Sequence, residues 1–168
     1  MGNNEEKINV NVVLCRNCDD DLKNIYSIFN NLKLDENKKA SFSILTLFSG
    51  YNLNYKKIRF DYFLEKVDSN RAYMYMGAIE IEKTNEVKTD KFGNQRKCSQ
   101  KEMTQEIFKK NCKNVTFLGA GQYEVQIYMC TDENIPDVGE DISEEEKKHI
   151  RDQKNLVSLY NFEVEEKL

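Results

Sequence analysis

The chain has 168 residues, of which 39% are hydrophobic and 32% charged, with one proline, seven glycines, no tryptophan and one histidine. This composition predicts one compact soluble domain, because a chain of this size buries about 70% of its unfolded surface without a disulfide or a metal. The 25 basic and 29 acidic residues give a net charge of −4. That sign argues against a protein that coats nucleic acid or an anionic membrane.

The N-terminus and the apolar runs predict neither export nor attachment to a membrane. Met1–Glu6 contains no positive and no apolar region, and Glu6 stands where a myristoylation signal needs serine or threonine. The apolar run Phe42–Phe48 is far shorter than the roughly 20 residues of a membrane span. We therefore expect a cytoplasmic protein without a membrane partner.

Strands are predicted wherever apolar residues alternate with polar ones over β-branched and aromatic stretches. In chain order they are Ile8–Leu14, Phe42–Phe48, Lys57–Lys66, Ala72–Lys83, the shorter Val115–Leu118, Tyr123–Cys130 and Leu156–Glu166. The third and fourth are expected to form a hairpin around Asp68–Asn70.

Lys57–Lys66 has the clearest alternation of apolar and charged residues. One set should face the core and the other largely water. The apolar set is Ile58, Phe60, Tyr62 and Leu64, and the other set is Arg59, Asp61, Phe63 and Glu65. In the next strand, four apolar residues at odd positions are predicted to lie in register, namely Tyr73, Tyr75, Ile79 and Ile81.

Helices are expected at few places. Leu22–Leu34 fits a helical stripe, but its residues are also tolerated in a bulged strand, so both interpretations stay open. A helix is predicted from about Glu144 to Gln153, where Ser143 and Glu146 form a capping box. It is polar almost all round, so it should decorate the surface between the last two strands. Met103, Ile107 and Phe108 are predicted to form one helical turn.

The net charge is the sum of two opposed segments. Residues 83–114 contain nine basic and four acidic residues, whereas residues 131–168 contain five basic and twelve acidic ones. We interpret residues 83–114 as a basic insertion and residues 131–155 as an acidic helical connection. The candidate interaction surface lies in the basic segment and consists of Lys91, Phe92, Arg96, Lys97 and Lys101.

The five cysteines predict reduced thiols more than a metal or redox site. Cys15 and Cys18 have C-x-x-C spacing, and Cys98 and Cys112 could complete a zinc site, but their separation does not match a zinc motif. Three aspartates follow Cys18 and would raise its thiol pKa, which argues against redox catalysis. We expect small buried residues near a strand end and assign no metal and no cofactor.

No catalytic set can be assembled from the sequence, so no catalytic residue is assigned. The one histidine, His149, lies in the predicted polar helix, and the single G-x-G at Gly119–Gly121 reads as a turn. An acidic loop around Pro136 lacks the spacing of a calcium-binding EF-hand; its acidic residues are Asp132, Glu133, Asp137, Glu140 and Asp141. Most aromatic residues are assigned to the core, although Tyr51 and Tyr55 fall in a turn where a contact surface is an alternative.

The succession of strands resembles a small bacterial β-sandwich family of unknown function with an immunoglobulin-like topology. The matching features are Val13–Cys15 followed by acidic residues, Asn24–Phe29, Phe42–Gly50 and Gly119–Tyr123. The resemblance implies that Asn24–Leu34 is a strand. It implies no catalytic residue and no ligand, since these features are structural.

The sequence thus predicts a mainly β, single immunoglobulin-like sandwich over residues 1–168, with seven or eight strands and one or two peripheral helices. We expect a non-enzymatic protein that binds another macromolecule, with a protein, including a second copy of the chain, favoured over nucleic acid. The alternative is a small-ligand or nucleotide-binding module that uses the basic segment. An enzyme that uses the Cys15/Cys18 pair or a metal ranks third. Abundant Asn and Lys, with AT-rich codons, predict an origin in a low-GC bacterium, its phage or a mobile element.

Overall fold

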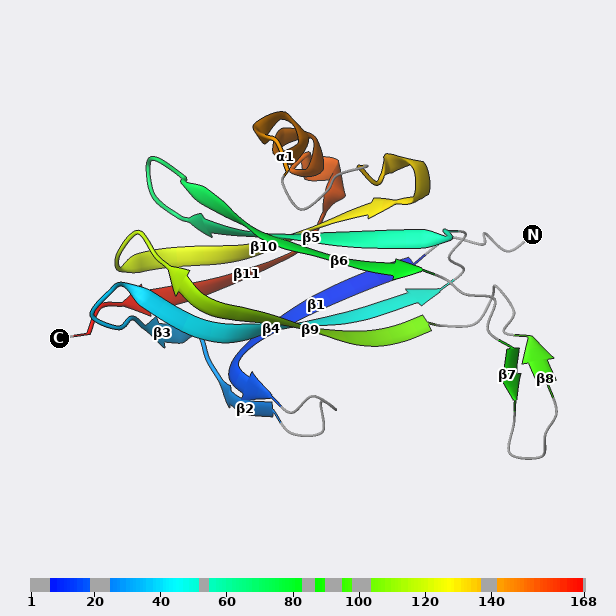
Figure 1. Cartoon of the computed structure of the whole chain (residues 1–168), viewed down its shortest axis with the longest axis horizontal. Coiled ribbons are helices and arrows are strands. Elements are labelled where there is room, and N and C mark those ends of the chain that lie inside the picture. Colours follow the sequence, from blue (N-terminus) through cyan, green and yellow to red (C-terminus); the bar gives the residue numbers. More distant parts are fainter. Residues whose placement is uncertain are drawn as a thin grey trace.

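The computed structural model describes residues 7–18, 25–51, 55–82, 87–89, 95–97, 104–136 and 142–167. In this part of the chain, nine strands form two sheets that lie face to face (Figure 1). The mainly β architecture predicted from the alternation is confirmed, with nine strands in the two sheets in place of seven or eight.

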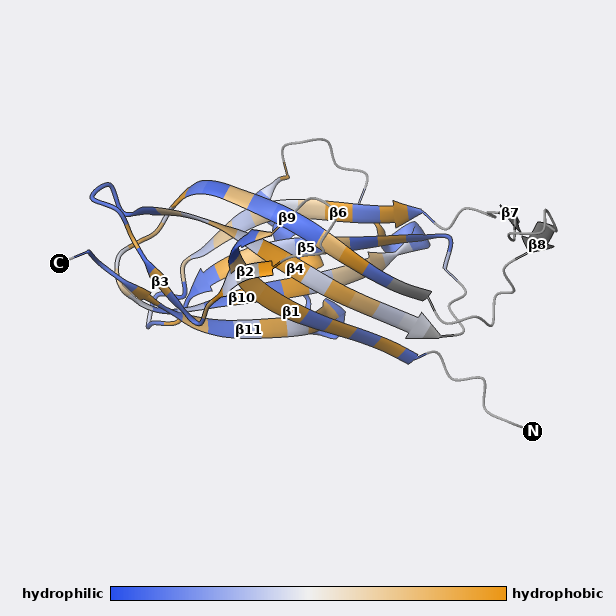
Figure 2. Ribbon diagram, turned by 90° about the horizontal axis from the view of Figure 1, so that it is seen from below, coloured by the Kyte–Doolittle hydropathy of each residue, from blue (hydrophilic) through white to orange (hydrophobic). Residues whose placement is uncertain are grey.

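The first sheet, sheet A, has the strand order β2–β1–β4–β9, and its neighbours are all antiparallel. Its strands are β1 (Lys7–Cys18), β2 (Ile25–Ile28), β4 (Lys39–Tyr51) and β9 (Thr104–Thr116). The predicted strands Ile8–Leu14 and Phe42–Phe48 are confirmed, and both extend further. Figure 2 shows hydrophobic and hydrophilic residues alternating along β1, as a strand with one face toward the core requires.

The second sheet, sheet B, has the strand order β3–β11–β10–β5–β6. Its strands are β3 (Asn31–Lys33), β5 (Lys57–Lys66), β6 (Tyr73–Glu82), β10 (Gly121–Thr131) and β11 (Leu156–Glu165). The predicted hairpin of β5 and β6 is confirmed, and β3 joins the sheet parallel to β11. A separate pair, β7 (Val87–Thr89) and β8 (Gln95–Lys97), lies away from the two sheets (Figure 1).

Residues 25–34 are two short strands, so the helical interpretation of Leu22–Leu34 is wrong over its described part; residues 22–24 lie outside the described residues. The chain pairs with β1 as β2 and then crosses to pair with β11 as β3. Phe29 and Leu32 are buried because they lie on this crossing, inside the core. Their spacing resembles that of a helix because the chain leaves one sheet and joins the other between them.

β9 overturns two predictions for residues 103–118. Val115 lies near the end of this 13-residue strand, which pairs with β4, and does not begin a short strand. Ile107 and Phe108 lie inside the same strand, so the predicted helical turn is wrong there, while Met103 is outside the described residues. The sequence of β9 shows no clear alternation of apolar and polar residues, because Lys110 occupies a half-buried position between the inward-facing Phe108 and Cys112.

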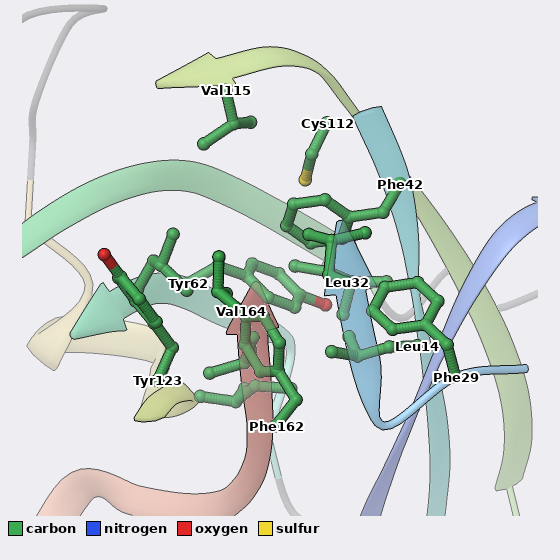
Figure 3. Packing of buried hydrophobic residues seen from close by; sticks show 14 of the residues in the cluster. Leu14, Phe29, Leu32, Phe42, Tyr62, Cys112, Val115, Tyr123, Phe162 and Val164 are labelled. Carbon is green, nitrogen blue, oxygen red and sulfur yellow. The ribbon is translucent and has the colours of Figure 1, made fainter. Parts of the chain in front are cut away.

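The main core lies between the two sheets and is rich in aromatic rings. Phe29 packs edge-on against Phe42 and Phe162, at ring-centre distances of 6.1 and 6.3 Å. Figure 3 shows these rings around Leu32, on the crossing between the sheets. Such edge-to-face pairs stabilise the core beyond the area that they bury.

The connection from β10 to β11 contains the helix predicted there. It consists of η1 (Asp132–Asn134), α1 (Glu144–Ile150) and η2 (Gln153–Asn155). The capping box of Ser143 and Glu146 is confirmed, although α1 ends at Ile150 and does not reach Gln153. α1 lies over the outer face of sheet B (Figure 1), where Ile150 packs against Phe63 and Tyr128. No helix in the described part of the chain is long and apolar enough to cross a membrane.

Candidate functional site

The side of β5 that was predicted to face water is buried. Arg59, Asp61, Phe63 and Glu65 are each no more than 6% exposed. The neighbouring strands β6 and β10 flank them, and the connection that carries α1 covers part of the sheet. Sheet B therefore has a second buried layer on its outer face, and this layer contains charged groups.

The first group in this layer forms around Arg59. Its Nε atom donates to both carboxylate oxygens of Asp61, each at 3.1 Å, and its Nη1 atom donates to Glu80 at 3.2 Å. Tyr75 donates its hydroxyl to Asp61 at 2.7 Å. Burial raises the pKa of Tyr75, and the hydrogen bond to Asp61 raises it further, so this tyrosine stays protonated at neutral pH.

The second group forms around Gln126, whose amide nitrogen donates to both Glu65 and Glu124. Tyr128 donates to the amide oxygen of Gln126 at 2.9 Å. Arg151, the residue after α1, places its Nη2 atom 3.3 Å from Glu65. The two groups together are called the outer network below.

The outer network joins the elements that carry it through paired charges and hydrogen bonds. A general acid–base pair needs two carboxyl groups with different environments and room for the reacting atoms. Here one amide bridges Glu65 and Glu124, and Arg151 occupies the side of Glu65 toward α1. Paired buried charges of this kind fix one arrangement of the elements that carry them.

A β-bulge in β6 explains why its tyrosines reach the outer face of sheet B. The register shifts between Tyr62 and Phe63, next to Gly77, which has a φ of 97°. Tyr73 and Tyr75 therefore pack on the outer face, whereas Ile79 and Ile81 pack into the main core. The prediction that all four lie in register is wrong, because a bulge reverses the faces of a strand.

The four described cysteines are buried, as predicted for small hydrophobic residues, and Cys130 lies opposite Arg59 in the pairing of β10 with β5. Cys15 and Cys18 pack with Leu45, whereas Cys112 lies in the main core between the sheets. Burial and, to a smaller extent, the neighbouring Cys18 raise the pKa of Cys15 to about 11. Among the described residues, no three His, Cys, Asp or Glu side chains are grouped to hold a metal ion.

The outer face of sheet A differs from the rest of the molecule because it is almost free of charge. Among the described outward-facing residues of 9–15, 43–49 and 107–111, Lys109 is the one charged side chain, and it donates to the Cys18 carbonyl. At the centre, Leu47 and Ile107 lie directly opposite each other and are 37% and 50% exposed. We call this surface the uncharged face; its other residues are Asn9, Asn11, Val13, Cys15, Ser43, Leu45, Ser49 and Asn111.

The candidate interaction surface predicted from the basic segment is not placed by the structure. Lys91, Phe92 and Lys101 lie outside the described residues, and for Arg96 and Lys97 only the backbone of β8 is described. Residues 104–114 of the same segment belong to β9.

The other residues weighed in the sequence have structural surroundings where they are described. Asp132 accepts hydrogen bonds from the backbone nitrogens of Lys56 and Lys57, each at 2.9 Å. Residues 137–141 of the acidic loop are outside the described residues. His149 is exposed on α1, and Tyr55 packs against the main core; the Tyr51 side chain is outside the described part.

Sequence reasoning missed both the outer network and the uncharged face. The outer network left no sequence signal. Arg59, Asp61 and Glu65 alternate with apolar residues as on any solvent-exposed strand face, and only the positions of β6 beside β5 and of α1 over the sheet show that they are buried. The uncharged face did leave one. The outward positions of the two predicted strands in residues 8–14 and 42–48 carry Asn, Ser, Val and Leu but no charge, in a chain that is 32% charged.

No protein-family model matches the chain, and no curated protein matches it.

Proposed function

We propose that the chain is a non-enzymatic, immunoglobulin-like protein-binding module that contacts its partner through the uncharged face. The proposal has two parts, the topology of the sandwich and the surface that binds. The observation that carries it is the near absence of charge among the described residues of this face, with the exposed side chains of Leu47 and Ile107 at its centre.

The strand order supports an immunoglobulin-like topology. Immunoglobulin sandwiches have strands A, B and E adjacent in one sheet and G, F and C in the other, with C′ beside C in the variable type. If β1, β4, β5, β6, β9, β10 and β11 are taken as A, B, C, C′, E, F and G, both sheet orders agree with this pattern. Residues 83–103 of the basic segment then fall between C′ and E, where strand D stands in an immunoglobulin chain.

A hydrogen bond at the start of β10 supports the same topology. The Tyr123 hydroxyl donates to the carbonyl oxygen of Gly119 at 2.8 Å. Immunoglobulin domains have a tyrosine at this corner, near the start of strand F, whose hydroxyl bonds to the backbone a few residues upstream. Gly119–Tyr123 is also one of the segments on which the resemblance to the bacterial sandwich family rests, and membership of that family is part of the proposal.

The composition of the uncharged face favours a protein partner over nucleic acid. The buried centres of protein interfaces are depleted in charged residues, whereas nucleic-acid interfaces are strongly positive. Leu47 and Ile107 are exposed apolar side chains at adjacent positions, and Asn11, Ser49 and Lys109 lie next to them in the sheet, which matches an apolar centre with a polar rim. The outer network, by contrast, links side chains of β5, β6 and β10 to one another and, through Arg151, to the end of α1.

The experiment introduces a charge at the centre of the uncharged face and at a matched site elsewhere. The test variants are Leu47→Glu and Ile107→Glu, and the control is Leu159→Glu on β11, where the leucine is 42% exposed on the outer side of sheet B. A partner is captured from the native host with the wild-type chain and purified, and its Kd is then measured for each variant. Sedimentation of the chain alone over a range of concentrations tests a second copy as the partner.

We expect both test variants to weaken binding by at least about tenfold, because a carboxylate is buried against the partner. The Leu159→Glu control should bind as the wild type does. The proposal fails if the two test variants retain the wild-type Kd, or if the control weakens binding as much as they do.

A further inference from the structure

A cleft opens at the end of the sandwich, away from the centre of the uncharged face. Its volume is about 380 Å³, and residues from β1, β3, β4, β9 and the segment after β11 line it. Leu32 and Leu34, both buried, are among the apolar residues of its lining. A cleft of this size falls in the range of small-molecule sites.

Positively charged side chains dominate the lining of this cleft. Arg16, Lys33, Lys39 and Lys167 line it, against a single lining carboxylate, Asp35. All four cations are exposed residues, and none forms an ion pair with another residue of the described part of the chain.

Two carboxylates beside these cations in the strand pairing or in the lining accept hydrogen bonds from other groups. Oδ1 of Asp35 accepts from the backbone nitrogens of Asn37 and Lys39, at 2.8 and 2.9 Å, and so closes its own turn. Glu165, which lies beside Lys33 in the pairing of β3 with β11, accepts from the side chain of Asn31 at 2.6 Å. The cations therefore surround the cleft in a protein whose net charge is −4.

Four positive side chains around one cleft repel one another, and the repulsion is relieved by a bound anion. Arg and Lys donors bind phosphate oxygens well, Arg through its planar fork and Lys as a point charge. The four cations come from four separate segments, which are β1, β3, β4 and the residues after β11. Two adjacent phosphates offer anionic oxygens to several segments at once.

We propose that this cleft binds a small molecule that carries two adjacent phosphate groups. Lys33, Lys39, Arg16 and Lys167 would contact the phosphate oxygens, and the leucines of the lining would contact any apolar part. Two sources share this chemistry, inorganic pyrophosphate and a nucleoside diphosphate. The site is independent of the proposed protein-binding surface, because its residues lie at the strand ends and none of them belongs to the uncharged face.

The test uses isothermal titration calorimetry of the full chain with pyrophosphate, ADP and adenosine. The variants are Lys33→Gln, Lys39→Gln and Arg16→Gln, with Lys113→Gln as the control, since Lys113 is an exposed residue of β9 outside the lining. Far-UV circular dichroism and thermal unfolding establish that each variant is folded before its titration is read.

We expect pyrophosphate and ADP to bind the wild type and adenosine not to bind. Each substitution of a cation in the cleft should weaken the binding of pyrophosphate and of ADP by about three- to tenfold. The Lys113→Gln control should bind both within about twofold of the wild type. Affinity should also fall as salt rises. If ADP binds more tightly than pyrophosphate, the ligand class is a nucleoside diphosphate. If the two bind equally, the cleft recognises the two phosphates alone.

The proposal is overturned if neither phosphate compound binds at about 10 mM, a level at which even a weak site is occupied. It is also overturned if adenosine binds as well as ADP, or if the Lys113→Gln control loses as much affinity as the variants of the cleft. None of these results bears on the uncharged face, whose test uses different residues and a protein partner.

Discussion

Arg151 stacks on Tyr73, with its guanidinium carbon 3.9 Å from the centre of the tyrosine ring. The same guanidinium reaches Glu65, so one side chain joins the end of α1 to both β5 and β6. The salt bridge and the cation–π contact therefore add to the packing of Ile150 in attaching this connection to sheet B.

Replacing Arg151 by alanine should lower the free energy of unfolding by about 2–4 kcal/mol, because Glu65 stays buried without this partner. Arg71 provides a matched control, since it also pairs with Glu65, at 3.5 Å, but its side chain is 61% exposed. Arg71→Ala should cost less than about 1 kcal/mol. Urea unfolding of the two variants measures both values, and similar losses would contradict the role given to Arg151.

Gly77→Ala should destabilise the protein by about 1–3 kcal/mol, because alanine is strained at the positive φ of the bulge. An added Cβ would also lie 2.8 Å from Nζ of Lys110, but that contact is with the far end of a flexible side chain. We therefore expect the same loss when Gly77→Ala is made in a Lys110→Met background. Urea unfolding of the four proteins forms a double-mutant cycle, and recovery in the double variant would mean that the contact, and not the backbone, causes the loss.

The protein should lose stability in alkaline solution. Burial raises the pKa of Tyr62 from 10.0 to about 12. Above pH 10 the unfolded chain therefore releases this proton before the folded one does, and stability falls by about 3 kcal/mol as the pH passes through 12. Tyr62→Phe should flatten this fall and cost about 1 kcal/mol at neutral pH, because the bond to Thr46 at 2.6 Å is lost.

Urea unfolding of the wild type and Tyr62→Phe from about pH 8 to about pH 12 gives the two slopes. The raised pKa values of Cys15 and Cys112, both about 11, leave a residual slope in the variant. Equal slopes in the two proteins would show that Tyr62 does not titrate as its burial requires.

Much of the fold could be predicted because alternation is a local property of the chain. Lys57–Lys66 was placed to the residue, and the capping box of Ser143 and Glu146 marked the start of α1. Both signals depend on side chains a few residues apart, so they survive without knowledge of the rest of the molecule.

The candidate sites could be predicted only in part. The basic segment was visible as a run of charge, but the cleft was not, because Arg16 and Lys167 come from opposite ends of the chain. The uncharged face required the pairing of β4 with β9 before Leu47 and Ile107 could be placed side by side. Residues that lie far apart in the sequence cannot be recognised as neighbours from the sequence alone, whatever their chemistry.

The sequence by itself determined that the protein is mainly β, where most of its strands lie, and which side chains of β5 face the core between the sheets. Only the tertiary structure decided that the other side of β5 is also buried, that the chain crosses between sheets at Phe29 and Leu32, and that a bulge at Gly77 divides the faces of β6. The physical reason is that alternation reports two different faces without saying what covers each one, and the cover is supplied by segments distant in the chain.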